Sequence, residues 1–286
     1  MATPVKQTVK VVTDSTADMA PEATRRLGVT VVPLMVLMGE ETYRDGIDIS
    51  ANDFYQRLPK LSKLPTTSQP SPGAFLKAYE EATAEGYQVI SIHLSAKLSG
   101  TYENAVVASR NFPEGQVTVF DTQQVSAGIA FFVMTAAEMA RNGYTASQIM
   151  AELESMKSRV KLIATVDTLE YLYKGGRIGG LKSFLGSLFS VKPILQLKDG
   201  EVQPLEQVRT RNKALQRIAE LTKAQGPFER LAILHGADPD GAGELANMIA
   251  PFYPLKEIYI SFVGPVIGTH GGPRTLGVVF QKAKNS

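Results

Sequence analysis

The sequence predicts an α/β protein that begins with a mostly parallel sheet covered by helices on both faces. Short apolar runs rich in β-branched residues, at 9–12, 87–92 and 116–120, have the length and composition of buried strands. Helical patterns separate these runs, and the connecting loops are short. Strands and helices that alternate in this way form parallel sheets, whose ligands bind at the carboxyl ends of the strands.

The other elements follow in chain order. Asp18 is expected to cap a helix that ends before Gly28, and Pro33 to interrupt an apolar strand over 29–38. A turn and a short polar strand are expected at 39–46. Further helices are predicted over 50–58, 72–86, 102–109, 127–137, 145–159, 209–225 and 238–250, and further strands over 162–166, 193–197, 202–208, 230–235, 257–262 and 276–280.

The second α/β unit is predicted to begin near Lys161. There a strand at 162–166 follows the helix that ends near Arg159, and a new series of strands and helices starts. A chain of 286 residues is long enough for two ordinary domains. We therefore expect two α/β domains, over 8–159 and 160–286.

Composition narrows the class of protein. The chain is 44% hydrophobic and 20% charged, as expected for a globular protein, and its formal net charge of +2 does not predict a nucleic-acid-binding face. The absence of cysteine excludes disulfides and thiolate metal sites and fits a cytoplasmic protein. The three histidines are far apart in sequence, so we expect no metal site. We also expect neither a signal peptide nor a membrane-spanning segment.

The stretch from His93 to Glu103 is the first candidate site. It joins a buried strand to a helix, with Ser99 at the expected N-cap and Gly100 in the first turn. Free backbone N–H groups and the helix dipole at such a turn suit an anion, and the hydroxyls of Ser99 and Thr101 stand beside it. The alternative is an ordinary capped helix.

Four further features could contribute to a site. The loop at 64–72 holds three prolines and several hydroxyls, which bond either their own backbone or a ligand. Glycines at 175–180 surround Arg177, whose guanidinium could meet an anion. The apolar segment at 181–197 is either core or the wall of an apolar cavity. His270, in a Gly- and Pro-rich segment predicted to be a loop, is either exposed or a hydrogen-bonding or proton-handling group.

Polar residues also follow the predicted parallel strands. Asp14, Ser99 and Asp121 each come after a strand, so we expect them at the same edge of the sheet. The residue two places after Asp14 is Thr16, which does not match the second aspartate of a phosphoryl-accepting loop. Asp14 and Ser15 are therefore expected to shape the loop or to line a cleft.

Taken together, these stretches resemble the DegV family of bacterial fatty-acid-binding proteins. The resemblance rests on six motifs in a consistent order, which are Val-Val-Thr-Asp-Ser-Thr-Ala-Asp (11–18), Thr-Thr-Ser-Gln-Pro-Ser (66–71), Leu-Ser-Gly-Thr-Tyr (98–102), Gly-Gly-Arg-Ile (175–178), Val-Arg-Thr-Arg (208–211) and Gly-Pro-Val-Ile-Gly-Thr-His-Gly-Gly-Pro (264–273). Each motif alone is weak, whereas six in sequence are specific.

The resemblance implies two α/β domains with a long-chain fatty acid, such as palmitate, in a cleft between them and no further cofactor. It implies that the carboxylate is held by Thr67 and Ser99, at the turn that includes Gly100, with His270 close to it. It also implies a role in lipid transport or fatty acid metabolism as a non-catalytic partner of a separate fatty acid kinase, which makes an acyl phosphate. Docking to that kinase or phosphate transfer would involve Arg177 and either Arg209 or Arg211.

The residues leave an enzyme as the alternative. Ser99 could be the nucleophile of a serine hydrolase or esterase, with His93 or His270 as its base. Against this, the Gly-x-Ser-x-Gly pattern is absent and no acidic partner is identifiable from the sequence. An enzyme acting on sugar or nucleotide phosphates is a further alternative, although the chain has no P-loop pattern.

Overall fold

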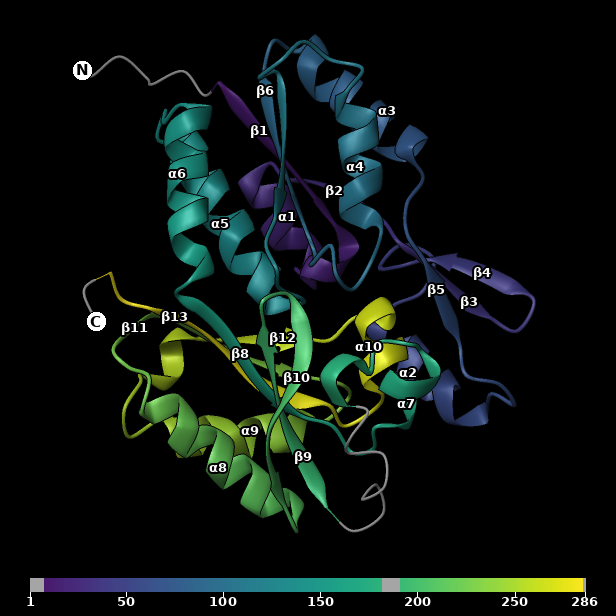
Figure 1. Ribbon diagram of the computed structural model, residues 1–286, viewed down its shortest axis with the longest axis vertical. Coiled ribbons are helices and arrows are strands. Elements are labelled where there is room, and N and C mark those ends of the chain that lie inside the picture. Colours follow the sequence, from purple (N-terminus) through teal and green to yellow (C-terminus); the bar gives the residue numbers. More distant parts are fainter. Residues whose placement is uncertain (1–7, 182–190, 285–286) are drawn as a thin grey trace.

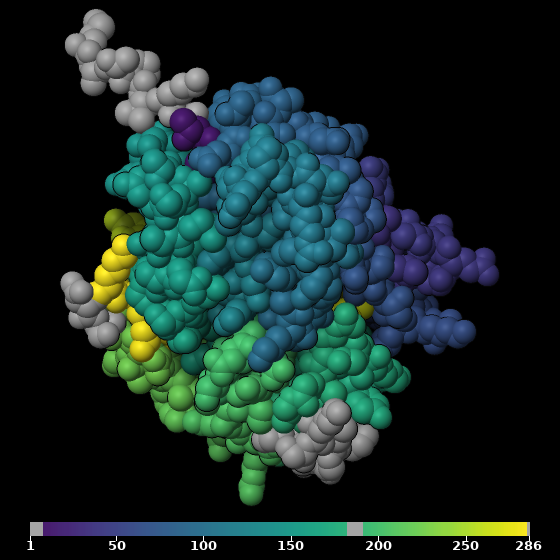
Figure 2. Space-filling view, turned by 45° about the horizontal axis from the view of Figure 1, so that its top comes forward, coloured from purple at the N-terminus to yellow at the C-terminus, as the bar shows by residue number. Residues whose placement is uncertain are grey.

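The computed structural model describes residues 8–181 and 191–284 and confirms the mixed α/β fold. Two sheets lie one above the other, with helices on their outer sides, and α5 (Ala127–Arg141) packs between them (Figure 1). A third, three-stranded sheet lies to one side (Figure 1). Its hairpin of β3 (Met35–Met38) and β4 (Glu41–Arg44) projects beyond the body of the molecule (Figure 2).

The upper sheet in Figure 1 is entirely parallel, as the alternation of strands and helices predicts. Its order is β2 (Thr30–Val32), β1 (Val9–Asp14), β6 (Gln88–His93) and β7 (Val117–Asp121). One face packs against α3 (Pro72–Ala84) and α4 (Thr101–Ser109), and the other against α5, α6 (Ala146–Lys157) and α1 (Pro21–Leu27). Neighbouring residues alternate between the two faces, so Val11 packs with α5 whereas Val12 packs with α3.

The lower sheet has six strands and is mostly antiparallel. Its order is β10 (Glu201–Val208), β9 (Lys192–Lys198), β8 (Val160–Thr165), β13 (Leu276–Lys282), β11 (Phe228–His235) and β12 (Ile258–Phe262). Only β11 and β12 pair in parallel. Helices α8 (Arg211–Lys223) and α9 (Pro239–Ile249) cover the outer face, and α5 contacts the inner face. The hairpin predicted around 198–201 joins β9 to β10 as expected.

The third sheet is antiparallel and consists of β4 (Glu41–Arg44), β3 (Met35–Met38) and β5 (Thr66–Ser68). Helices α2 (Ala51–Arg57), α7 (Glu170–Lys174) and α10 (Pro265–Gly271) pack beside it, and short 3-10 turns lie at Ser15–Ala17, Leu58–Lys60 and Leu255–Glu257. The prediction of one strand over 29–38 is wrong, because the chain leaves the upper sheet after β2 and enters the third sheet as β3. Pro33 lies between the two strands, where a missing backbone N–H removes no ladder bond.

Helix α5 explains why its sequence is apolar all round. It lies between the two large sheets, so its side chains on both sides are buried, including Ile129, Phe132 and Val133. The hydrophobic cluster around it draws residues from β1 and β6 and also from β8, β11 and β13. The boundary predicted between 8–159 and 160–286 stays a prediction, because this one core spans it.

Side-chain caps mark the starts of several predicted helices, whereas the caps predicted at Asp18 and Ser99 are wrong. Thr145 forms a full capping box, and Ser50, Ser71 and Asp238 accept from the first turns of their helices. Asp18, however, caps no helix. It adopts a left-handed conformation after the first 3-10 turn, and its carboxylate accepts from the N–H of Gly264, whereas the α1 N-cap is Ala20 without a side-chain bond. The N-cap of α4 is Gly100 and not Ser99.

Candidate functional site

A largely apolar cavity lies where the three sheets meet. Its empty volume, which counts the open solvent at its mouth, is about 890 Å³. Both halves of the chain line it. The apolar lining residues are Leu34, Leu94, Leu98, Val125, Leu162, Ala164, Val166, Leu172, Leu195, Leu197, Val202, Leu234, Val266 and Ile267. We call this the apolar cavity.

Part of the predicted apolar wall is confirmed. Leu195 and Leu197 on β9, within the segment 181–197, line the apolar cavity. The Phe184-Leu185 and Leu188-Phe189 pairs of that segment lie outside the described residues. The other apolar wall residues lie on strands, loops and the helices α7 and α10. The sequence analysis did not identify them as cavity wall, because an apolar side chain facing a cavity has no distinct local pattern.

A cluster of polar side chains closes one end of the apolar cavity. Thr67 on β5, Ser99 before α4, Arg177 after α7 and His270 on α10 all contribute to the lining. The Thr67 hydroxyl Oγ1 lies 2.9 Å from Nε2 of His270, although the two residues are 203 positions apart. Along β5 only Thr67 is turned inward, since its neighbours are exposed. The structure thus brings together four of the predicted site residues.

His270 is on a helix, and the prediction of a loop is wrong. Pro265 occupies the first turn of α10, where its missing N–H costs nothing, and the helix ends after Gly271. Gly268 allows this helix to pack closely on α2, because a Cβ there would overlap the ring of Tyr55. The glycines that seemed to indicate a loop therefore permit close packing of a short helix.

Burial keeps His270 neutral. Burial, together with the nearby positive charge of Arg177, lowers the pKa of the imidazole to about 4. Among the described residues, Nδ1 of this imidazole has no hydrogen-bond partner. The ring lies directly over Gly175, where a side-chain Cβ would overlap Nδ1. Gly175 thus leaves the space that the imidazole occupies.

Arg177 stands between the apolar cavity and the surface. Its guanidinium donates from Nε to the Leu98 carbonyl at 3.1 Å and from Nη1 to the Gly175 carbonyl at 2.7 Å. Arg177, Thr67 and His270 also line a second, more polar depression on the other side, together with Lys174. We call this the polar vestibule. The polar end of the apolar cavity therefore adjoins a surface that carries two basic side chains.

Ser99 and Gly100 have different positions in the site. The Ser99 hydroxyl lines the apolar cavity, lies 2.9 Å from the Thr101 hydroxyl and accepts from the Thr101 N–H at 3.3 Å. Gly100 is the helix cap and is not among the residues that line the cavity within the described chain. The side chain of Gln69 covers it, so closely that a Cβ at Gly100 would lie 2.7 Å from the Gln69 amide nitrogen.

Arg209 and Arg211 lie elsewhere. Neither is among the described residues that line the apolar cavity or the polar vestibule. Arg209 is exposed, whereas Arg211 forms an ion pair with Asp238 at the start of α9 and donates to the Arg274 carbonyl at 3.0 Å. The role expected for one of them in docking stays a prediction.

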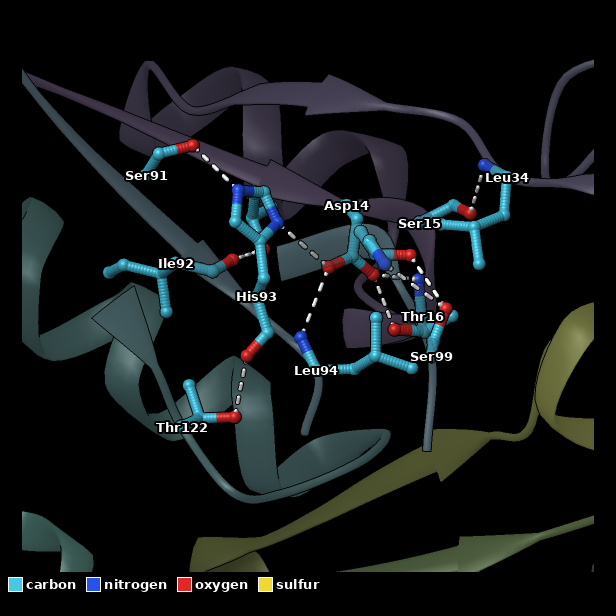
Figure 3. A network of polar contacts seen from close by, with 12 residues as sticks. Asp14, Ser15, Thr16, Leu34, Ser91, Ile92, His93, Leu94, Ser99 and Thr122 are labelled. Atoms are coloured by element: carbon cyan, nitrogen blue, oxygen red, sulfur yellow. Dashed lines mark hydrogen bonds and ion pairs between the residues drawn. The ribbon is translucent and has the colours of Figure 1, made fainter. Parts of the chain in front are cut away.

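A buried network joins the ends of β1 and β6 (Figure 3). His93 Nδ1 lies 2.9 Å from Asp14 Oδ2, and its Nε2 lies 2.6 Å from the Ser91 hydroxyl. The Leu94 N–H donates to the same Asp14 oxygen at 3.2 Å. The sequence analysis placed Asp14 at this edge but missed its pairing with His93, since the two are 79 positions apart.

This network bears on the serine hydrolase alternative. Ser91, His93 and Asp14 have the bonding order of a catalytic triad, but all three are fully buried, so no substrate reaches them. Ser99 bonds to Thr101, and His270 bonds to Thr67. The geometry therefore gives Ser99 no general base, and the charge-bearing residues of the cavity are suited to binding.

Two general features of the described residues limit what the site can hold. Across 8–181 and 191–284, no group of three or more His, Asp or Glu side chains is placed to hold a metal ion. Over the same ranges, no helix is both long and apolar enough to cross a membrane.

Comparisons with known proteins agree with the geometry. Residues 8–283 match the family model described as "Uncharacterised protein, DegV family". A fatty-acid-binding DegV protein from Thermus thermophilus superposes with a TM-score of 0.91 at 38% identity, covering 96% of this chain and 99% of that one. DegV of Bacillus subtilis, described as a fatty acid binding protein, gives 0.88 at 37% identity, with 97% and 100% covered. A stearic acid-binding protein from Eubacterium ventriosum gives 0.85 at 27% identity, with 96% and 98% covered.

Proposed function

This chain belongs to the DegV family, and on that premise we propose that it binds a long-chain fatty acid, such as palmitate, in the apolar cavity. The observation that carries the proposal is the form of the cavity, whose wall is largely apolar and whose lining includes the polar cluster of Thr67, Ser99, Arg177 and His270. That arrangement matches a molecule with a long hydrocarbon tail and a single carboxylate. The fatty-acid-binding relatives support the same ligand class.

In this proposal the tail supplies most of the affinity. Burying about fifteen methylenes at roughly 0.8 kcal/mol each gives on the order of 12 kcal/mol before the costs of binding. One hydrogen bond to a charged carboxylate contributes only about 1.5–3 kcal/mol. The head group therefore fixes the direction in which the acid binds rather than how tightly.

The carboxylate is proposed to lie between Thr67, Ser99 and His270. Both hydroxyls can donate to it, and the neutral imidazole can donate from whichever ring nitrogen carries the proton. Arg177 lies at the boundary of the cavity, so its positive charge offsets the negative charge of the carboxylate while the guanidinium stays outside the apolar part of the wall. Gly100, as the N-cap of α4, is proposed to support the site through the helix dipole, which favours an anion at this end of the helix.

We further propose that the protein is a cytoplasmic carrier that presents the carboxylate to a separate fatty acid kinase. Phosphoryl transfer needs an accessible carboxylate and compensation of the developing charge. The polar vestibule supports this role, because it lies beside Thr67 and His270 and carries Lys174 and Arg177. Either Arg209 or Arg211 would then extend the docking surface, a part of the proposal that the vestibule itself does not include.

Extraction of the purified protein tests the ligand. The protein is denatured, extracted with organic solvent, and the extract is analysed by mass spectrometry. A stoichiometric long-chain fatty acid is the expected result. Ester hydrolysis by protein that carries no fatty acid would contradict the proposal and favour the hydrolase.

Arg177→Ala separates binding from presentation. This variant is expected to retain its fatty acid yet to lose acyl phosphate formation with a fatty acid kinase. Arg26→Ala, on the exposed side of α1, is the matched control and should behave like the unaltered protein. Normal turnover by Arg177→Ala would exclude the docking role. Loss of bound lipid together with a lower melting temperature would mean that Arg177 only supports the loop.

A further inference from the structure

A second cleft, separate from the apolar cavity, lies where the loop after β1 meets the β4–α2 loop and the end of β12. Its empty volume is about 1330 Å³, counting open solvent. It shares no lining residue with the apolar cavity among the described residues. Three aspartates line it, Asp14, Asp18 and Asp45, and no Lys, Arg or His among the described residues does. We call this the acidic cleft.

The three carboxylates differ in how well the protein satisfies them. Both oxygens of Asp14 are occupied, by Thr16 and by His93 with the Leu94 N–H (Figure 3). Asp18 and Asp45 each retain one enclosed oxygen, Oδ2, that has no hydrogen-bond partner within the described chain. Asp45 is only 3% exposed, so bulk solvent does not reach this oxygen. A buried carboxylate without a partner is costly, and it marks a place where something else can bind.

A third unsatisfied oxygen belongs to the same group. The hydroxyl of Tyr55 is buried without a partner among the described residues, and both Asp18 and Asp45 act on its charge state. The two carboxyl groups are close together, because a Cβ at Gly264 would lie 2.6 Å from Asp18 Oδ1 and 3.6 Å from Asp45 Oδ1. Tyr55 also stacks on Phe262, which lines the cleft. Tyr55 itself is not among the described residues that line the cleft, so the carboxyl groups of Asp18 and Asp45 form its polar part.

The rim of the cleft is apolar. Nine large hydrophobic side chains are exposed in the part of the chain described, and four of them line this one cleft, namely Val31, Ile47, Ile260 and Phe262. Scattered apolar residues need no explanation, whereas a cluster around a hollow indicates a ligand or partner surface. A ligand that fits therefore combines a positive charge with an apolar body.

We propose that the acidic cleft binds a small organic ammonium compound, with its charged nitrogen at Asp18 and Asp45 and its apolar part against the rim. The N–H groups of a primary ammonium can donate to the unpaired oxygens of these two carboxylates. A bare metal ion fits less well, since no group of three or more acidic or histidine side chains in the described residues is placed to hold one, and an ion has no use for the apolar rim.

Calorimetric titration of the full-length, lipid-loaded protein with benzylammonium tests this site. Benzyl alcohol has the same ring without the charge and serves as the ligand control. Benzylammonium is expected to bind, and Asp45→Asn to weaken it at least tenfold. The exposed Asp240→Asn on α9 is the matched variant control and should leave the affinity unchanged.

Each other outcome overturns the proposal. Equal binding of benzyl alcohol would make the cleft a non-specific apolar hollow. Binding of K⁺ or Mg²⁺ in place of benzylammonium would make it an inorganic cation site, and absence of benzylammonium binding would exclude the ammonium class. Unchanged binding by Asp45→Asn, with its melting temperature confirming the fold, would place the ligand elsewhere. Lipid extracted from the same samples reports on the apolar cavity independently, because the two sites share no lining residue.

Discussion

The apolar cavity and the acidic cleft lie on either side of α10, and the protein treats charge in opposite ways in the two. Val266, Ile267 and His270 of α10 face the cavity, whereas Gly264 and Pro265 at its start line the cleft. The cavity keeps its titratable group, His270, neutral and gives it a hydroxyl partner. The cleft keeps Asp18 and Asp45 together without a compensating base. The cavity thus pairs its titratable group within the site, whereas the cleft brings two carboxyl groups together with no basic side chain among the described residues that line it.

The largest effect expected concerns the apolar cavity and fatty acid chain length. Affinity should rise by up to roughly tenfold for every two methylenes until the cavity is full, and then fall. A chain-length series measured by displacement of a fluorescent fatty acid checks this. The acidic cleft, with its polar floor, should show no such dependence. Affinity that does not change with chain length would mean that the apolar residues are ordinary core.

The next effect concerns the stability of the acidic cleft. Burial, together with the nearby charge of Asp14, raises the pKa of Asp45 to about 6. At neutral pH the folded protein therefore carries an uncompensated charge that costs up to about 3 kcal/mol. Asp45→Asn is expected to stabilise the ligand-free protein by up to that amount in urea unfolding at neutral pH. A less stable Asp45→Asn variant would show that the carboxylate already has a partner.

The two sites should also respond to acid in opposite directions. Asp45 binds a proton more readily when folded, so its penalty disappears as the pH falls from about 6 to about 4. His270 binds a proton less readily when folded, so its contribution is full above about pH 6.5 and is lost as the pH falls toward about 4. For each of Asp45→Asn and His270→Gln, the difference in free energy of unfolding from the unaltered protein is measured across this pH range. Plotted against pH, the two differences should have opposite slopes. Slopes of the same sign would contradict the opposite acid responses expected for the acidic cleft and the apolar cavity.

The sequence predicts features that depend on a few neighbouring residues better than features that depend on contacts between distant segments. The parallel strands and several caps were predictable, since periodicity and capping residues act over a few positions. The cluster of Thr67, Ser99, Arg177 and His270 was expected from the family resemblance. The helical state of His270 was missed, because its glycines are explained only by close packing against α2. Nothing near Asp45 in the sequence indicates that one of its oxygens is unpaired, since that depends on distant segments.

A smaller effect is expected at the polar end of the apolar cavity. Thr67→Ala and Ser99→Ala each remove one hydrogen bond to a charged carboxylate, so fatty acid affinity should fall roughly tenfold to a hundredfold for each. Ser68→Ala is the control, because this neighbour of Thr67 on β5 is exposed and lines neither the apolar cavity nor the polar vestibule. Thermal unfolding should be little changed. If the double variant binds as tightly as the unaltered protein, the carboxylate lies elsewhere.

The smallest effect expected comes from one methyl group at Gly175. Its φ and ψ suit any residue, but the new Cβ overlaps the His270 ring and lies 2.9 Å from the Tyr171 carbonyl oxygen, so the loop must also shift slightly. The imidazole must then turn away from Thr67, and fatty acid affinity should fall about tenfold, as for the loss of one hydrogen bond. Gly243→Ala in α9 is the matched control, because its Cβ meets open space. Benzylammonium binding in the acidic cleft should not change in either variant. An unchanged fatty acid affinity in Gly175→Ala would mean that the position of His270 does not matter for the carboxylate, and that the neutral imidazole acts only as part of the cavity wall.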